Sequence, residues 1–426
     1  MKYLKKFENH SQYESYIATD YAKPNVSYCV TEGDVHYNPK THDYVDDYLT
    51  FVALEDTTFK LTIGSAVSES ILSSISYSTD GGETWNTTNN VNSQTVTITT
   101  PTISEGEKVL WKGSGTGVST TTNNSNRPST SSIFSSSGRF NAEGNIMSLI
   151  YGDDFSDEDS VEGTYNFALL FYSYNMPDTA KIVSVKNMIF PIKSISTCCY
   201  FRMFQHCPLL EEAPSSIDAE SIGNSGCTNM FWTCNNLKTT PKLQATTLGS
   251  YCCQNMFGMC ISLTTATELI ATTLANYCYN QMFVGCTNLT TGPHRIGSSD
   301  TIMAPSACTN MFSGCTNLTT APELPATTLV ENCYSEMFYN CTSLKTAPVL
   351  PATTLANYCY TYMFYGCRSL NYIKAMFTTT PGESYTINWV RGVASTGTFV
   401  KNSAATWTTT GVNGVPNGWT VETVSA

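Results

Sequence analysis

Charged residues are scarce in this chain of 426 residues, since Asp, Glu, Lys and Arg make up only 13% of it. Average soluble proteins carry roughly twice that share. Basic residues are the fewest: 22 Lys and Arg stand against 34 Asp and Glu, for a net charge of −12. There is no basic stripe to displace counterions from phosphates, so we expect no nucleic-acid partner. Ser, Thr and Asn fill the gap, which is typical of β-rich extracellular or virion proteins.

Long apolar runs and catalytic motifs are also missing. No stretch approaches the roughly 18 apolar residues of a membrane-spanning helix, so we expect no membrane insertion. The basic start is interrupted by Glu8 and Asn9 before an apolar leader core can form, so we expect no general secretion signal. The five His are scattered, and no phosphate-binding loop, His-Glu-x-x-His or Gly-x-Ser-x-Gly motif occurs. These absences predict a protein that is not an enzyme and binds no cofactor.

What the chain does contain is a repeat. A Met-Phe pair recurs at intervals of 26 to 29 residues, at Met203, Met230, Met256, Met282, Met311, Met337 and Met363. Each Met is followed four positions later by a Cys, namely Cys207, Cys234, Cys260, Cys286, Cys315, Cys341 and Cys367. Another Cys precedes each Met by three or four positions, at Cys199, Cys227, Cys252, Cys278, Cys308, Cys333 and Cys359. A fixed period of this length indicates stacked structural units.

Each unit has a local pattern. Leu355, Cys359, Met363 and Cys367 are spaced by four, which predicts a short helix ending near the left-handed residue Gly366. The Pro-marked segment that follows predicts one short strand. A helix and a strand in about 26 residues is the leucine-rich-repeat plan. We therefore predict a mixed α+β, β-rich fold in which residues 198–370 form a solenoid of seven repeats with strands about 4.8 Å apart.

The flanking segments predict further units. Residues 165–197 look like a degenerate repeat that caps the solenoid, and residues 371–426, with three Trp, are expected to close its other end. Short alternating strands between Leu49 and Trp111, with hairpin chemistry at Asp80-Gly81-Gly82-Glu83, predict an Ig-like β-sandwich over residues 46–115. Residues 116–164 contain a Ser/Thr/Gly/Asn-rich run and are expected to be a linker and lead-in. Residues 1–45 are expected to form an N-terminal docking unit.

Sixteen of the 17 cysteines lie in the repeats, and three roles are open to them. Metal binding would need ligands two to four residues apart or a column of His, and neither is present. A disulfide ladder is possible in stacked rungs, although neighbours in one column offer no unique partner. The third role, which we favour, is that Cys and Met fill a narrow core as small, soft hydrophobic residues. The acidic run at 153–159 lacks the Gly and terminal Glu of an EF-hand loop, so we interpret it as a solvated charge cluster rather than a calcium site.

Aromatic residues are the best candidates for binding. Six tyrosines recur at fixed places in the units: Tyr200, Tyr279, Tyr334, Tyr339, Tyr360 and Tyr365. If exposed, they would form ladders with flat area and hydroxyls for sugar rings or another protein. The alternative is that they only cover the helix layer.

The repeat Cys-Tyr-x-x-Met-Phe-x-x-Cys-x-x-Leu-x-x-Ala-Pro-x-Leu-Pro-Ala-Thr-Thr-Leu resembles the BspA-like leucine-rich repeats of gut anaerobes and their phages. Residues 293–305 depart from it, with three added residues and an expected bulge. The resemblance implies surface adhesion without catalytic residues. The opening Lys-Phe-Glu-Asn-His and Val-His-Tyr-Asn-Pro also resemble the N-termini of virion proteins of crAss-like phages.

The resemblance implies a virion protein, associated with the tail or a fibre and assembled in the host cytoplasm. Its N-terminal part would dock on other virion proteins, and its solenoid would recognise a glycan or protein of the host surface. Homo-oligomers, including trimers, stay open. The alternatives are a bacterial cell-surface adhesin and, from another class, a glycan-degrading enzyme, which would require a carboxylate pair in a cleft.

Overall fold

The computed structural model describes residues 5–7, 28–30, 35–37, 47–67, 70–89, 95–119, 131–173 and 179–425. It divides into two compact units, residues 1–47 and 48–426. In the first unit β2 (Tyr28–Val30) pairs in parallel with β1 (Lys5–Phe7) and antiparallel with β3 (Val35–Tyr37). The rest of the expected docking unit lies outside the described residues.

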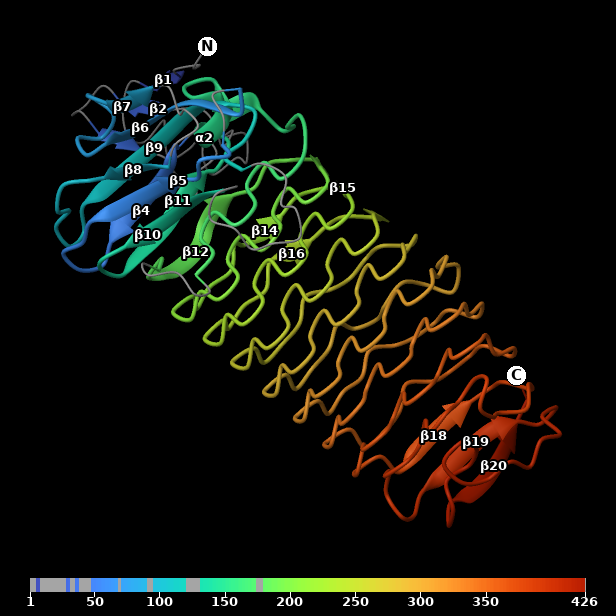
Figure 1. The fold of residues 1–426 in the computed structure, drawn as a ribbon. Coiled ribbons are helices and arrows are strands. Elements are labelled where there is room, and N and C mark those ends of the chain that lie inside the picture. Colours follow the sequence, from blue (N-terminus) through green and yellow to red (C-terminus); the bar gives the residue numbers. More distant parts are fainter. Residues whose placement is uncertain are drawn as a thin grey trace. The chain divides into compact units, whose positions relative to one another are not determined.

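The second unit begins with a β-sandwich (Figure 1). One sheet has the strand order β10-β5-β8 and the other β12-β11-β4-β9-β6-β7. Their bounds are β4 (Leu49–Ala53), β5 (Phe59–Ile63), β6 (Leu72–Ser78), β7 (Asn86–Asn89), β8 (Val96–Thr99), β9 (Lys108–Gly115), β10 (Ser132–Ser136), β11 (Phe140–Asn145) and β12 (Ile182–Ile189). Phe51 of the larger sheet contacts Phe59 and Phe134 of the smaller one, at ring-centroid distances of 5.2 and 4.8 Å. The expected strands and the hairpin between β6 and β7 are confirmed.

The sandwich extends beyond the expected boundary at residue 115, and the expectation that 116–164 is a linker is wrong for its described part. β10 and β11 belong to the two sheets, and α2 (Ser148–Tyr151) and η3 (Phe155–Asp157) follow them. β10 reads Ser-Ile-Phe-Ser-Ser and is buried at every position, so its serines do not mark solvent exposure. β12, from the expected cap, pairs in parallel with β11. The sandwich and the solenoid therefore share one sheet.

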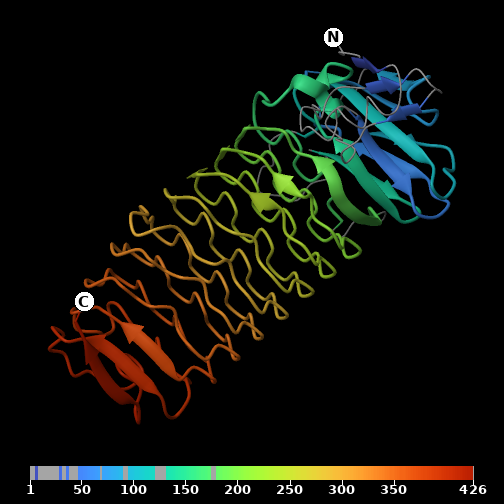
Figure 2. The same ribbon diagram turned by 180° about the vertical axis from the view of Figure 1, so that it is seen from behind.

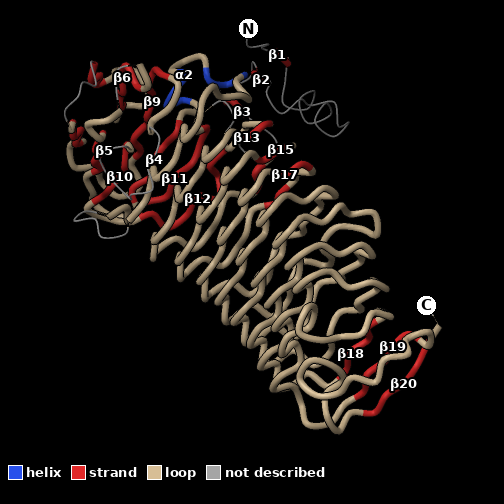
Figure 3. The backbone as a smooth tube through the Cα atoms, turned by 45° about the vertical axis from the view of Figure 1, so that its right-hand side comes forward, coloured by secondary structure: helices blue, strands red, loops and turns tan. Residues whose placement is uncertain are grey.

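The solenoid is a stack of rungs with almost no helix (Figures 2 and 3). Where helices were expected, each rung has a run of consecutive turns, which we call its turn segment. It extends from five residues before the repeat Met to the Cys four residues after it, as in residues 358–367. Every fourth residue in it is left-handed: Tyr358, Tyr362 and Gly366 have φ of 56°, 52° and 74°. Alternate amides donate to the carbonyl three residues back or to the next rung, as in Met363 to Tyr360 and Phe364 to Trp389. In an α-helix, residues spaced by four point about 40° farther round the axis at each step. In these turn segments the same spacing keeps Cys and Met pointing into the core at every step.

Successive rungs place identical side chains on top of one another. Eight phenylalanine rings stack with centroids 5.2 to 5.7 Å apart and planes within 9° of parallel: Phe171, Phe204, Phe231, Phe257, Phe283, Phe312, Phe338 and Phe364. The seven repeat methionines before the last seven of these rings are fully buried beside them. The stack starts at Phe171, and Trp389 contacts Phe364 at its far end, 6.1 Å away. The solenoid therefore continues on both sides of residues 198–370.

Outside the turn segments, successive rungs are joined by short parallel strand pairs and single bridges. β13 (Ser194–Ile195), β15 (Ser221–Ile222) and β17 (Thr247–Leu248) form one parallel sheet, and β14 (Ser216–Ile217) and β16 (Lys242–Leu243) form another. Isolated bridges continue them through the later rungs. The expected bulge at 293–305 is confirmed. The bridged residues Ile296 and Ile302 are six positions apart, whereas their partners in the preceding rung, Leu269 and Thr273, are four positions apart. The parallel sheet β18 (Tyr372–Ala375), β19 (Thr398–Asn402) and β20 (Thr420–Val424) ends the stack.

Candidate functional site

The sixteen repeat thiols are free and buried. In each of the seven rungs the second Cys donates its S–H to the carbonyl of the stacked Phe one rung earlier, at 3.0 to 3.1 Å. Burial raises the pKa of the Cys286 and Cys367 thiols to about 12. A protonated, buried thiol is neither a nucleophile nor a metal ligand. Among the described residues, no group of three or more His, Cys, Asp or Glu could hold a metal ion. These cysteines belong to the core, where each S–H also joins two rungs.

The first cysteines occupy two neighbouring columns rather than one, as the backbone hydrogen bonds between rungs show. Cys227 and Cys308, three residues before their Met, stack in line with the tyrosines Tyr279 and Tyr334. Cysteines four residues before their Met, such as Cys199, stack in the adjacent column. The difference between three and four positions, visible in the sequence, separates the two columns.

Four of the six candidate tyrosines are not available to a ligand. Tyr200, Tyr279, Tyr334 and Tyr360 are between 0% and 3% exposed, because their column faces the interior. Burial raises the pKa of each of these phenols well above its ordinary value. The prediction that they form a binding surface is wrong; they are core residues, like the methionines beside them.

Tyr339 and Tyr365 lie on the surface, half-buried. Their rings stack with centroids 4.8 Å apart and planes 5° from parallel. Stacking turns the ring faces toward each other, so the flat area expected for sugar rings is not exposed between them. What the pair offers is ring edges and hydroxyls.

Sequence reasoning missed other surface tyrosines on the turn segments. Tyr251 and Tyr277 stack with centroids 4.8 Å apart, and Tyr251 and Tyr358 are 39% and 42% exposed. All three are the first left-handed residue of their turn segment. Their column contains Ser and Asn in other rungs, so no constant tyrosine marked it. The sequence feature that could have identified them is their distance from the repeat Met, because each of the three tyrosines lies five residues before it.

One group of surface side chains has defined mutual geometry, and we call Tyr339, Tyr362, Tyr365 and Arg391 the tyrosine–arginine cluster. Tyr362 meets Tyr365 edge to face at 5.8 Å. The exposed Arg391 guanidinium lies 5.8 Å from the Tyr365 ring centroid. In the part of the chain that the structure describes, none of the three hydroxyls has a hydrogen-bond partner and Arg391 has no ion pair. Unpaired donors beside ring faces can form hydrogen bonds and cation–π contacts with a ligand.

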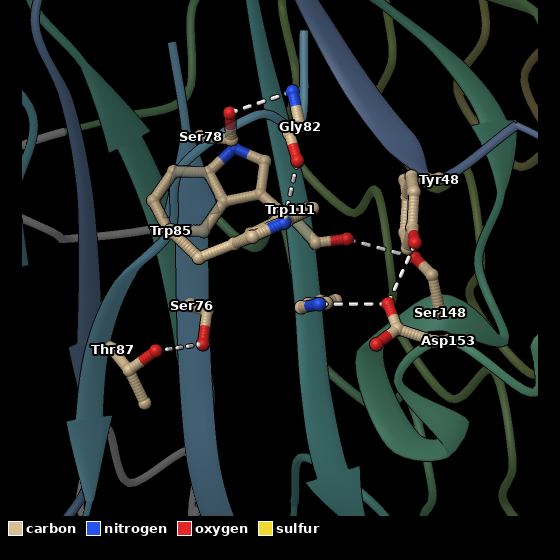
Figure 4. A network of polar contacts seen from close by, with 10 residues as sticks. Tyr48, Ser76, Ser78, Gly82, Trp85, Thr87, Trp111, Ser148 and Asp153 are labelled. Atoms are coloured by element: carbon tan, nitrogen blue, oxygen red, sulfur yellow. Dashed lines mark hydrogen bonds and ion pairs between the residues drawn. The ribbon is translucent and has the colours of Figure 1, made fainter. Parts of the chain in front are cut away.

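A second polar network lies in the sandwich and is structural (Figure 4). Asp153, from the acidic run, accepts from Tyr48 Oη at 2.6 Å and pairs with Lys112 Nζ at 2.7 Å. Lys112 Nζ also lies 4.1 Å from the Trp85 ring centroid. Burial, then the hydrogen bond and charge of Asp153, raises the pKa of Tyr48 to about 12. These contacts hold the segment after α2 against β9.

Comparisons with known proteins add little. Protein-family models give no match to the chain, and curated proteins give none either. The crystal structure of a leucine-rich repeat protein from Bacteroides ovatus ATCC 8483 is similar at 13% sequence identity, over 62% of this chain and 94% of that chain, with a TM-score of 0.17. The fold therefore rests on the stacked rungs themselves. In the described residues no helix has the length and apolarity to cross a membrane.

Proposed function

We propose that this protein is a non-enzymatic adhesion protein whose turn segments bind a ligand on a host surface. The tyrosine–arginine cluster carries the proposal, because ring stacking sets its geometry and its hydroxyls have no hydrogen-bond partner in the described residues. The core supports it: Cys, Met and Phe are used up in packing between rungs. Interaction chemistry is left to the outward positions, as in other solenoids.

The finer proposal, which rests on the sequence resemblance, is that the protein is a virion structural protein of a phage, in a tail or fibre appendage. The N-terminal part would attach to other virion proteins while the solenoid meets the host. Locating the chain in intact particles by electron microscopy tests this. Finding it instead on the envelope of a bacterial cell would support the alternative, a cell-surface adhesin.

Binding of the labelled full chain to a panel of gut anaerobic bacteria tests the adhesion function. We expect binding that falls about tenfold or more in the double variant Tyr339→Ala/Tyr365→Ala, because alanine removes exposed anchors of an interface. The matched control is Tyr334→Phe, which removes a buried hydroxyl whose nearest partner is Met303 Sδ at 3.8 Å. Equal binding by both variants and the unaltered chain would refute the role of the cluster, and release of reducing ends from host polysaccharide would refute the non-enzymatic assignment.

A further inference from the structure

We infer that the tyrosine–arginine cluster recognises a carboxylate-bearing sugar of an acidic polysaccharide. The inference deepens the proposed function and rests on it, because it names the ligand class for the same surface. Three observations support it: the charge of this part of the chain, the state of Arg391, and the donors around it.

Charge is distributed unevenly along the chain. Residues 341–426 contain five basic residues and two acidic ones, a net charge of +3. Because the whole chain has a net charge of −12, residues 1–340 have a net charge of −15. The basic residues are Lys345, Arg368, Lys374, Arg391 and Lys401, and the acidic ones are Glu383 and Glu422. Screening limits charge effects to about 8 Å at physiological ionic strength. Charges that lie farther than this from Arg391, which include most of the acidic remainder of the chain, therefore have little effect on an anion that binds there.

Arg391 is the cation that lies against the cluster's rings. It follows Trp389 and Val390, which are buried, so its backbone position is set by the core. It takes the place in its rung that Tyr339 and Tyr365 take in theirs, since Gly366 donates its amide to the Arg391 carbonyl. Lys401, by contrast, already donates to the Trp407 carbonyl at 2.8 Å. A guanidinium on a ring face keeps its edge N–H groups free for an acceptor.

The donor set indicates a carboxylate within a saccharide. Two parallel N–H groups of a guanidinium match the two oxygens of a planar carboxylate. The phenol hydroxyls of Tyr362 and Tyr365, without partners in the described chain, can exchange hydrogen bonds with the hydroxyls of the same sugar. A single stacked arginine does not make the run of phosphate contacts that nucleic acid requires. The cluster therefore fits one acidic sugar ring rather than a polyanion backbone.

The experiment measures binding of the full chain to immobilised polygalacturonate and to its methyl ester, which keeps the backbone and removes the charge. We expect at least about tenfold tighter binding to the acid form, because a charge-assisted hydrogen bond outweighs a neutral one. Arg391→Ala should lose about tenfold or more on the acid form, and Arg391→Lys should recover part of the loss, since it keeps the charge without the fork. The matched control Arg368→Ala, at an exposed arginine with no ring contact, should stay within about twofold.

Two further probes separate this inference from other anion binding. Dextran sulfate and polyglutamate carry sulfate and peptide carboxylate; binding to either as tight as to polygalacturonate would overturn the assignment of an acidic sugar. Equal binding to the acid and the ester, or equal loss in Arg391→Ala and Arg368→Ala, would also overturn it. If these results occur while Tyr339→Ala/Tyr365→Ala still lowers binding to bacteria about tenfold or more, the adhesion function stands and only the ligand class is wrong.

Discussion

Replacing one second-column cysteine probes whether sulfur fills a dry core and joins two rungs. Cys286 is fully buried in the middle of the solenoid, and its Sγ donates to the Phe257 carbonyl at 3.0 Å. Cys286→Ala removes a group of about methylene size, worth about 0.8 kcal/mol. The residual cavity adds roughly 0.5 kcal/mol, and the weak S–H bond adds about 0.5–1 kcal/mol. The Phe257 carbonyl keeps its bond from the Cys260 amide at 3.1 Å, so it is not left unsatisfied.

We therefore expect Cys286→Ala to lower the free energy of unfolding by about 2 kcal/mol. Cys286→Ser should cost less than that, because its hydroxyl can still donate to the same carbonyl. The measurement is the shift in the urea midpoint of the full chain, with the exposed Thr291→Ala as a control expected to stay within about 0.5 kcal/mol. A cost below about 0.5 kcal/mol for Cys286→Ala would mean that the sulfur packs against nothing, and a cost above about 4 kcal/mol would mean that it forms a disulfide or a metal bond.

Three other predictions concern pH and backbone. Burial raises the pKa of the Cys207, Cys278 and Cys286 thiols to about 12, above the ordinary value of 9.0 that they regain on unfolding. The contribution of these thiols to stability should therefore be constant below about pH 9, and stability should fall steeply above that pH. Urea midpoints between about pH 8 and higher pH measure this, and a flat profile over that range would contradict the burial of neutral thiols. Gly314 has φ of 77°, and an added Cβ would meet no atom closer than 3.6 Å. Gly314→Ala should therefore lower the free energy of unfolding by about 1–2 kcal/mol through backbone strain alone, and Gly314→Asn should lower it less. Thermal unfolding measures both, and equal costs would refute the left-handed assignment. Asp153→Asn should cost less than about 1 kcal/mol at neutral pH because the pair with Lys112 is partly exposed. The pKa of Asp153 is lowered, first by its hydrogen bond from Lys112, so its contribution is present above the ordinary Asp pKa and is lost as pH falls; unchanged acid sensitivity in the variant would contradict this.

The sequence predicted the solenoid, its period and its core because those depend on repeated identities. Met-Phe and Cys recur at constant spacing, and stacking is the way such units bury them. The helix was mispredicted because a spacing of four describes both a helical face and a chain of turns; the difference lies in backbone angles such as that of Tyr362, which no residue identity reveals. β10 was missed because a run of serines is typical of a loop, and the sequence does not show that every position of this strand is buried.

The candidate site was predicted in part. Tyr339 and Tyr365 lie on the surface, whereas Tyr334 and Tyr360 face the core only five residues earlier in the same turn segments. The sequence records the recurrence of tyrosine and not the direction of its side chain. Arg391 could not be placed, because the last turn segment has neither Cys nor Met and its register becomes visible only through the bond from Gly366.

Thiol labelling of the purified full chain, followed by intact-mass analysis, tests the shared dry interior most directly. We predict that the sixteen repeat thiols are reduced and unreactive toward an alkylating reagent in the native protein, and that all of them react once urea unfolds the chain. Rapid labelling of several repeat thiols under native conditions, or a mass that shows them already oxidised, would contradict a core in which every rung packs its sulfur against the next.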